Sequence, residues 1–350
     1  MAIPSNMQSI TAEWMTDALS ASIGTCTVAS LRVERIGEDQ GWTGQVGRVW
    51  IEYTDAPPDA PDSVIAKFSP LDIGGVFGGR EVNFYQEFAA AQGFAVPVCY
   101  HSAIDAQTGE NIAILEDFSN LNTVPFVDGC TPAQAEAAVV ALAEIHARWW
   151  NDPTLKSKEW LFSIAESDFA DWWAQYPDEV ARLLPDFDLS PRLLEFGDRF
   201  ASDLPAMLQR IEGAPFTCIH RDIHVDNLLF GSEPQDPKVI LVDWQTVGRG
   251  RGPSDIAYLL ISSLSPSDRK SNERRLVGMY HDHLVSSGIE DYSKDQCWSD
   301  YLVSAASKLF ITVTATINFD NTSSHRTAWR TADLERLTAF FDDHNPISEL

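Results

Sequence analysis

The densest group of chemically capable side chains lies in residues 218–230, Cys-Ile-His-Arg-Asp-Ile-His-Val-Asp-Asn-Leu-Leu-Phe. Asp222 stands near its centre, Asn227 follows five positions later, and apolar residues flank the loop. A carboxylate can orient a hydroxyl group and accept its proton, while an amide oxygen further along can bind magnesium on phosphate groups. The pattern therefore predicts phosphoryl transfer, with Asp222 as the base and Asn227 as a metal ligand. A chance polar loop between two strands is the alternative.

A second carboxylate follows the apolar run Lys238-Val-Ile-Leu-Val-Asp243, 21 residues after Asp222. A strand over this run would deliver Asp243 at its end, where it could bind magnesium that bridges the β- and γ-phosphates. An acidic residue at the end of a strand is weak evidence for a metal site when it stands alone. The prediction for Asp243 becomes strong because it follows Asp222 and Asn227 at a kinase-like spacing.

Lys67 is one of seven lysines and the only one among the first 155 residues. It lies in the apolar run 63–68, and Glu81 follows 14 residues later at the start of a helical pattern. A buried ammonium group needs a partner, so we expect an ion pair with Glu81 that holds Lys67 against the α- and β-phosphates. The alternative is a lysine at a strand edge that points to water.

A glycine-rich segment, Gly41-Trp-Thr-Gly-Gln-Val-Gly47, separates two predicted strands. Gly44 and its neighbours could let the backbone approach phosphates, with amide groups as donors. An ordinary glycine-rich hairpin would look the same. The chain has no G-x-x-x-x-G-K-[ST] segment, which excludes a P-loop enzyme at the level of motifs.

The elements around these residues change in character along the chain. Alternating and apolar runs predict a small sheet in the first third, with a helix over 81–91 that Gly93 ends. Thr131 and Gln134 form a capping-box pattern for a helix through Trp149, and helical patterns continue to residue 215. The last hundred residues are again mostly helical. Strands are expected at 31–36, 46–53, 63–68, 112–115, 216–220, 228–230 and 239–242.

This order predicts an α/β (α+β) bilobal, protein-kinase-like fold. Residues 1–117 would form a sheet-rich N-terminal lobe with a hinge at Glu116-Asp117, and residues 118–350 a larger helical lobe with the catalytic loop and acceptor site. ATP would bind between the lobes.

The combined motifs resemble those of the aminoglycoside phosphotransferase and choline kinase superfamily. In detail they are most similar to the ecdysteroid kinase-like branch and its bacterial relatives, and the resemblance spans roughly residues 10–340. The residues that carry it are Ile114-Leu-Glu-Asp117, His146-Ala-Arg-Trp-Trp150, His220-Arg-Asp-Ile-His-Val-Asp-Asn227, Val242-Asp-Trp-Gln245 and Gly252-Pro-Ser-Asp-Ile-Ala-Tyr-Leu259.

The resemblance implies an ATP- and magnesium-dependent enzyme that phosphorylates a small-molecule hydroxyl. It assigns the base to Asp222, the metal ligands to Asn227 and Asp243, and the phosphate anchor to Lys67 with Glu81. The backbone of Leu115, Glu116 and Asp117 would meet the adenine, and Asp255 would brace the catalytic loop.

Two positions depart from the family pattern. Arg221 stands where many members have glycine, and Trp244-Gln245 replaces Phe-Gly after the metal-binding aspartate, so no flipping switch is inferred. We interpret His224 as a hydrogen-bond partner within the loop and His146 as a satisfied core histidine. The tryptophan pairs 149–150 and 172–173 could line an acceptor pocket, although core packing is the simpler interpretation.

Composition limits the partners. The net charge of −26 argues against nucleic acid and anionic membrane, and favours either a cationic acceptor or a role in solubility alone. The five cysteines are scattered, and no signal peptide or long apolar run is visible, so we expect a cytoplasmic protein without disulfides.

Three functions other than a small-molecule kinase remain as alternatives: a protein kinase, a nucleotide-binding scaffold without activity and a nucleotidyltransferase. No obligate protein partner is indicated.

Overall fold

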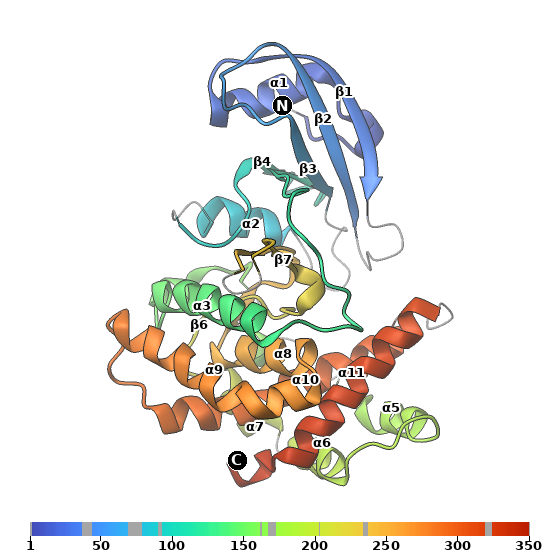
Figure 1. The fold of residues 1–350 in the computed structure, drawn as a ribbon, viewed down its shortest axis with the longest axis vertical. Helices are drawn as coiled ribbons and strands as arrows, with labels where there is room; N and C mark the ends of the chain where they lie inside the picture. The colour runs from blue at the N-terminus through green and yellow to red at the C-terminus, as the bar shows by residue number, and fades with distance from the viewer. Residues whose placement is uncertain are drawn as a thin grey trace. The chain divides into compact units, whose positions relative to one another are not determined.

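The computed structural model describes residues 2–36, 44–68, 79–89, 93–161, 163–166, 173–202, 204–233, 237–318 and 324–349 (Figure 1). The chain divides into two compact units. We call residues 1–120 together with 242–247 the N-terminal unit, and residues 121–241 together with 248–350 the C-terminal unit.

A five-stranded antiparallel sheet forms the centre of the N-terminal unit, with strand order β1-β2-β3-β5-β4. One of its faces carries fully buried apolar side chains such as Val49, Val64 and Ile114, which pack with residues of helix α1. The sheet predicted from alternation is therefore present. Its strands are β1 (Thr27–Ile36), β2 (Gln45–Asp55), β3 (Ser63–Phe68), β4 (Cys99–Ile104) and β5 (Asn111–Glu116).

Two elements of this unit were not predicted, and one has different bounds. Helix α1 (Ala12–Ile23) and strand β4 are additions. Helix α2 runs from Arg80 to Glu87 and ends well before residue 91. It ends early because the N–H groups of Phe88 and Ala89 both bond to the carbonyl of Phe84, which closes the last turn.

Helices make up most of the C-terminal unit, with two short strand pairs between them (Figure 1). The predicted capping box is present: the Thr131 hydroxyl accepts from the Gln134 N–H, and the Gln134 side chain accepts from the Thr131 N–H. The helices are α3 (Pro132–Arg148), α5 (Tyr176–Leu183), α6 (Pro191–Ser202), α7 (Leu204–Glu212), α8 (Pro253–Ser263), α9 (Pro266–Ser286), α10 (Lys294–Asn318) and α11 (Ser324–Asp343). Strand β6 (Thr217–Ile219) pairs with β9 (Gly248–Gly250), and β7 (Leu228–Phe230) pairs with β8 (Val239–Leu241).

Helix α8 is the centre of this unit, since every one of its residues is buried. It packs against α3, α9, α10 and α11. Because α8 is packed on all sides, its residues Asp255 and Tyr258, which bond to the loop between β6 and β7, have fixed positions.

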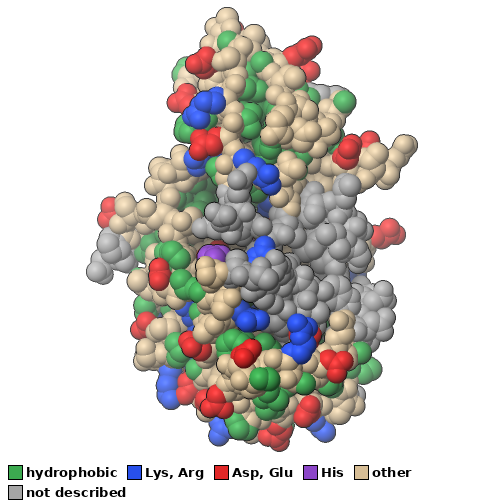
Figure 2. All heavy atoms as spheres, turned by 90° about the vertical axis from the view of Figure 1, so that its right-hand side faces the viewer, with side chains coloured by type: hydrophobic (Ala, Val, Ile, Leu, Met, Phe, Trp, Pro, Cys, Tyr) green, Lys and Arg blue, Asp and Glu red, His purple; other side chains and the backbone are tan. Residues whose placement is uncertain are grey.

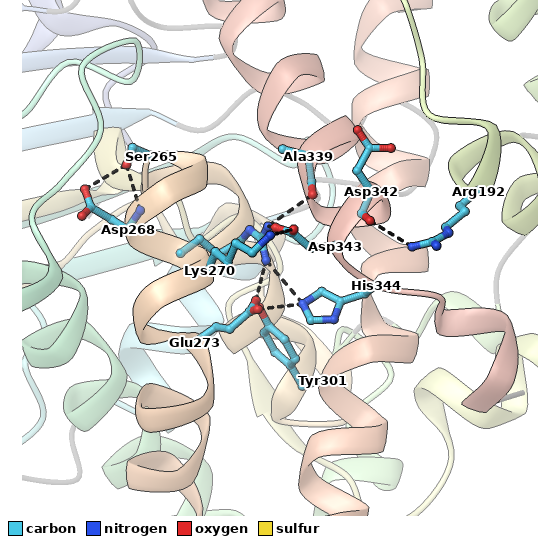
Figure 3. Close-up of polar contacts among 11 residues, drawn as sticks. Arg192, Ser265, Asp268, Lys270, Glu273, Tyr301, Ala339, Asp342, Asp343 and His344 are labelled. Atoms are coloured by element: carbon cyan, nitrogen blue, oxygen red, sulfur yellow. Dashed lines mark hydrogen bonds and ion pairs between the residues drawn. The ribbon is translucent and has the colours of Figure 1, made fainter.

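A polar cluster joins the end of α11 to α9 (Figure 3). Arg269, fully buried, donates to Glu273 Oε2 at 2.6 Å and to Asp343 Oδ2 at 2.5 Å, and His344 Nε2 lies 2.7 Å from Glu273 Oε1. Burial opposes ionisation of Glu273, but His344 and Arg269 together hold the pKa of its carboxyl below the usual value.

The mixed α/β fold, with one sheet-rich unit and one helical unit, confirms the predicted fold class. On the face drawn in Figure 2, acidic side chains are scattered over both units. In the part of the chain that the structure describes, no helix is both long and apolar enough to cross a bilayer.

Candidate active site

Lys67 on β3 lies between two carboxylates of the N-terminal unit. Its Nζ is 2.9 Å from Glu81 Oε2 on α2 and 2.6 Å from Asp243 Oδ1. The side chains of Lys67 and Glu81 are almost fully buried, whereas that of Asp243 is 29% exposed. The expected Lys67–Glu81 pair is thus formed, and Asp243 completes a trio.

Charge balance keeps Lys67 protonated. Burial lowers the pKa of its ammonium group, but Asp243 and then Glu81 outweigh this and raise the pKa above its ordinary value. The trio places two carboxylates around one ammonium group. Because Asp243 is the exposed member, a further cation would be favourable beside it.

The segment that carries Asp243 is fixed by its neighbour Trp244. The Trp244 N–H donates to Glu81 Oε1 at 3.1 Å, and the indole ring, fully buried, stacks on Phe84 of α2 with centroids 3.9 Å apart. Asp243 itself has a left-handed backbone, with φ 67°. Moving this segment would break the hydrogen bond and expose a large ring, which agrees with the absence of a Phe-Gly type switch.

Asp255 on α8 organises the loop that follows β6 in the C-terminal unit. Its buried carboxylate accepts the backbone N–H of His220 at 2.6 Å and of Arg221 at 2.9 Å. His146 Nε2 lies 3.3 Å away, and His146 Nδ1 is 3.0 Å from the Tyr280 hydroxyl. Burial opposes ionisation, but these bonds hold the pKa of Asp255 below its usual value. His146 is a core residue with both nitrogens engaged, as interpreted from the sequence.

Arg221 adopts the left-handed backbone conformation, with φ 69°, that favours glycine. Its guanidinium group compensates by donating to Glu212 Oε2 and to the Arg249 carbonyl, each at 2.6 Å. Arg221 therefore adopts a backbone conformation that is usual for glycine, while its buried side chain is fixed by these two hydrogen bonds.

Asp222 and Asn227 meet in this loop. The Asp222 side chain is 34% exposed, and its Oδ1 accepts from the Tyr258 hydroxyl at 2.9 Å. Asn227 Nδ2 donates to the Asp222 carbonyl at 2.7 Å, which leaves the amide oxygen of Asn227 as the atom suited to a cation. His224 Nε2 lies 3.4 Å from Asn227 Nδ2 and 3.6 Å from Asp222 Oδ1, in agreement with a bracing role.

The donor set fits magnesium better than a transition metal. Asn227 offers an amide oxygen and Asp243 a carboxylate, and magnesium prefers few protein oxygens supplemented by phosphates and water. Among the described residues, no group of three or more His, Cys, Asp or Glu side chains could hold a metal alone. Asn227 and Asp243 belong to different units.

The predicted adenine segment is at the end of β5. Leu115 is paired with both β3 and β4, and the Glu116 N–H donates to the Val98 carbonyl at 2.8 Å. The Asp117 carboxylate is bound by Arg48 and Ser63, each at 2.7 Å. Asp117 is the first residue after β5, so the predicted adenine segment covers the last two residues of this strand and the position where the chain leaves it.

Only part of the predicted glycine segment can be placed. Gly41 lies outside the described residues. Gly44 has φ 81° and is exposed, so it has the freedom that a close approach to phosphate requires. Gly47 has a packing role, because a Cβ there would meet Met7 Sδ at 2.8 Å.

Tyr258 and Lys308 were not predicted as site residues. Tyr258 is buried behind Asp222, and Lys308 Nζ lies 4.8 Å from the centroid of the Tyr258 ring. A helical spacing was the available signal, since Tyr258 follows Asp255 by three positions and thus lies on the same face of α8. Nothing local in the sequence links Lys308 to this site. Trp173, by contrast, is core packing: it is buried and stacks on Tyr176.

A separate cavity of about 620 Å³ lies elsewhere in the C-terminal unit, around Trp150, Arg210 and Arg251. The buried carboxylate of Asp300 joins the two guanidinium groups, and Tyr292 also donates to it at 2.7 Å. Trp150, one of the tryptophans that could line an acceptor pocket, lies in this cavity, whereas the predicted catalytic, nucleotide-binding and metal-binding residues do not, and the two arginines are paired with Asp300.

Comparisons with known proteins find similarity in sequence to one family and similarity in fold to several solved structures. A model of the ecdysteroid kinase-like family matches residues 158–289. A comparison with curated protein sequences finds no significant match.

Several solved structures share the fold. A protein assigned as an aminoglycoside phosphotransferase from Ralstonia eutropha JMP134 is 15% identical, with a TM-score of 0.55 over 93% of this chain and 97% of that one. Choline kinase from Cryptosporidium parvum Iowa II is 12% identical, with a TM-score of 0.54 over 89% and 90%. An aminoglycoside 2′-phosphotransferase in complex with GDP is 12% identical, with a TM-score of 0.55 over 95% and 98%.

At these identities the structural likeness establishes the fold. The resemblance predicted from the motifs is borne out at this level: the chain shares the fold of these solved phosphotransferase and choline kinase structures, and its residues 158–289 match the model of the ecdysteroid kinase-like family.

Proposed function

We propose that this protein transfers the γ-phosphoryl group of ATP to a hydroxyl group of a small molecule, with magnesium as cofactor. The observation that carries the proposal is the loop around Asp222. Its backbone is held by Asp255, the Asp222 carboxylate is one-third exposed, and Asn227 uses its Nδ2 group on the Asp222 carbonyl, so that its amide oxygen is the atom suited to a cation. The solved structures with this fold include proteins named as phosphotransferases for aminoglycosides and as choline kinase.

In the proposed reaction, the acceptor oxygen bonds to the γ-phosphorus while the bond to the β,γ-bridging oxygen breaks, which releases ADP. Asp222 orients the acceptor hydroxyl and accepts its proton as the new bond forms. Lys67, held by Glu81, would bind the α- and β-phosphates. Asn227 and Asp243 would hold magnesium, which supplies neutralisation of the phosphate charge when bound.

The proposal requires both units to engage the same nucleotide, with residues 1–117 providing the nucleotide-binding part and residues 118–350 the acceptor part. The partly exposed carboxylate of Asp243, next to Lys67, supports a metal at this residue. Rigid anchoring of Trp244 supports a site that is preformed rather than switched.

The test is ATP consumption by the purified protein with magnesium, across simple alcohols, amino sugars, choline-like amines and sterols. Mass spectrometry of the product separates phosphorylation, a gain of one phosphoryl group, from nucleotidylation. Phosphorylated product that depends on both acceptor and magnesium would support the proposal. Tight ATP binding without turnover on any acceptor would favour a nucleotide-binding scaffold, and absence of ATP binding would contradict the proposal.

A further inference from the structure

The side chain of Asp222 is oriented from behind by a buried tyrosine. The Tyr258 hydroxyl is 2.9 Å from Asp222 Oδ1, and only 3% of Tyr258 is exposed. Asp255, three residues earlier on α8, holds the backbone of the same loop. One helix therefore fixes both the backbone around Asp222 and its carboxylate.

The direction of this hydrogen bond is settled by chemistry. Burial, and then the charge of Asp222, raise the pKa of Tyr258 well above its ordinary value, so the phenol keeps its proton and donates. Oδ1 is thereby occupied. Within the part of the chain that the structure describes, Oδ2 has only a long contact of 3.5 Å to Asn227 Nδ2, which makes it the oxygen suited to receive an acceptor hydroxyl.

Tyr258 is in turn held by a buried ion pair. Lys308 Nζ on α10 lies 4.8 Å from the Tyr258 ring centroid and 2.6 Å from Asp333 Oδ1 on α11. Thr312 accepts from Lys308 at 2.9 Å and donates to Asp333 at 2.7 Å. Lys308 and Asp333 are 1% and 0% exposed. A buried ion pair is costly to desolvate and is weak support for stability, so a role in fixing its neighbours is the better explanation.

We propose that Tyr258 is a positioning residue for Asp222, and that the Lys308–Asp333 pair holds the Tyr258 ring in place. This inference rests on the proposed function of Asp222. By occupying Oδ1 and preventing rotation of the carboxylate, Tyr258 would present Oδ2 alone to the acceptor hydroxyl.

The test is Tyr258→Phe, which removes one oxygen and keeps the ring. We expect kcat to fall about 10- to 100-fold while the KM for ATP and the melting temperature stay close to those of the unmodified protein. Tyr301→Phe is the matched control: Tyr301 is fully buried and donates to the Glu273 carboxylate at the same distance of 2.9 Å, in the cluster of Figure 3. An unchanged kcat in Tyr258→Phe, or an equal loss in both variants, would overturn the inference.

A second variant tests the ion pair without leaving a lone buried charge. In Lys308→Met combined with Asp333→Asn, we expect a folded protein with a lower kcat and an unchanged KM for ATP. A kcat equal to that of the unmodified protein would show that the pair does not hold Tyr258.

A crystal structure of Tyr258→Phe gives a readout that does not depend on turnover. We expect the Asp222 carboxylate in more than one rotamer, and a single unchanged position would contradict the inference. If Asp222→Ala kept full activity while the carboxylate became disordered in Tyr258→Phe, the proposed role of Asp222 would fail but its positioning by Tyr258 would stand.

Discussion

Asp255 accepts a 2.6 Å hydrogen bond from the backbone N–H of His220, across 35 residues of sequence. The same carboxylate accepts from Arg221, which has the left-handed backbone. The turn that leads into Asp222 is thus imposed by a buried charge on a helix where every residue is buried. The geometry of the loop depends on α8 as much as on its own residues.

Asp255→Ala should therefore destabilise the protein. It leaves two buried N–H groups without an acceptor, at about 1–3 kcal/mol each, and it frees a strained turn. We expect a loss of about 2–6 kcal/mol in the free energy of unfolding, measured by urea denaturation. Asp282→Ala, at a side chain 62% exposed, is the control and should change little. Equal stabilities for both variants would show that Asp255 does not hold the loop.

Low pH should act through the same carboxylate. The pKa of Asp255 is lowered in the folded state, and so is that of Glu273. Their stabilising contribution is therefore complete above the unfolded pKa values, about 3.9 and 4.3, and is lost as the pH falls through the folded values. We expect the free energy of unfolding to be flat above about pH 5 and to fall steeply toward pH 3. Glu273→Gln should flatten part of that slope, and an unchanged slope would contradict its assignment.

Lys67→Met should impair nucleotide use and leave the fold intact. It removes the ammonium group proposed to hold the phosphates, while Glu81 can become protonated because burial raises its pKa. We expect kcat/KM for ATP to fall about 100-fold or more, in steady-state assays. Lys294→Met, at a lysine 62% exposed, provides the comparison. ATP kinetics that match in the two variants would remove Lys67 from the site.

Asn227→Ala should raise the magnesium requirement. The amide oxygen is lost, so we expect the magnesium concentration for half-maximal rate to rise about 10-fold or more. Asn272→Ala is the control, because Asn272 Nδ2 likewise donates to a backbone carbonyl, at 2.8 Å against 2.7 Å for Asn227. If the magnesium dependence of Asn227→Ala matched that of the control, Asn227 would not be a metal ligand.

The sequence predicted the elements with strong local patterns. Alternation located β2 and the second half of β1, an apolar run located β3, and the Thr131–Gln134 capping box located the start of α3. Helix α1 was missed although Thr11 caps it, since its burial depends on the sheet. Strand β4 was missed because none of its residues is fully buried and its pattern is weak. The early end of α2 depends on a closing turn at Phe84 that no spacing indicates.

From the sequence, the candidate site could be predicted only where its residues form a recognisable pattern over a short stretch of the chain. The Lys67–Glu81 pair followed from an isolated lysine on an apolar strand, and Asp222 and Asn227 from their spacing. The contact of Asp243 with Lys67 joins residues 176 positions apart, and Lys308 approaches Tyr258 from another helix. Such contacts arise from tertiary packing, which a single sequence does not display.

The most direct test of the central claim compares the protein with Asp222→Asn, a change that keeps the shape of the side chain and removes its charge. We predict that acceptor-dependent phosphoryl transfer falls by at least about 100-fold while the Kd for ATP with magnesium changes less than about 3-fold. Phosphoryl transfer at a comparable rate in Asp222→Asn would contradict the assignment of Asp222 as the base and, with it, the proposed reaction at this loop.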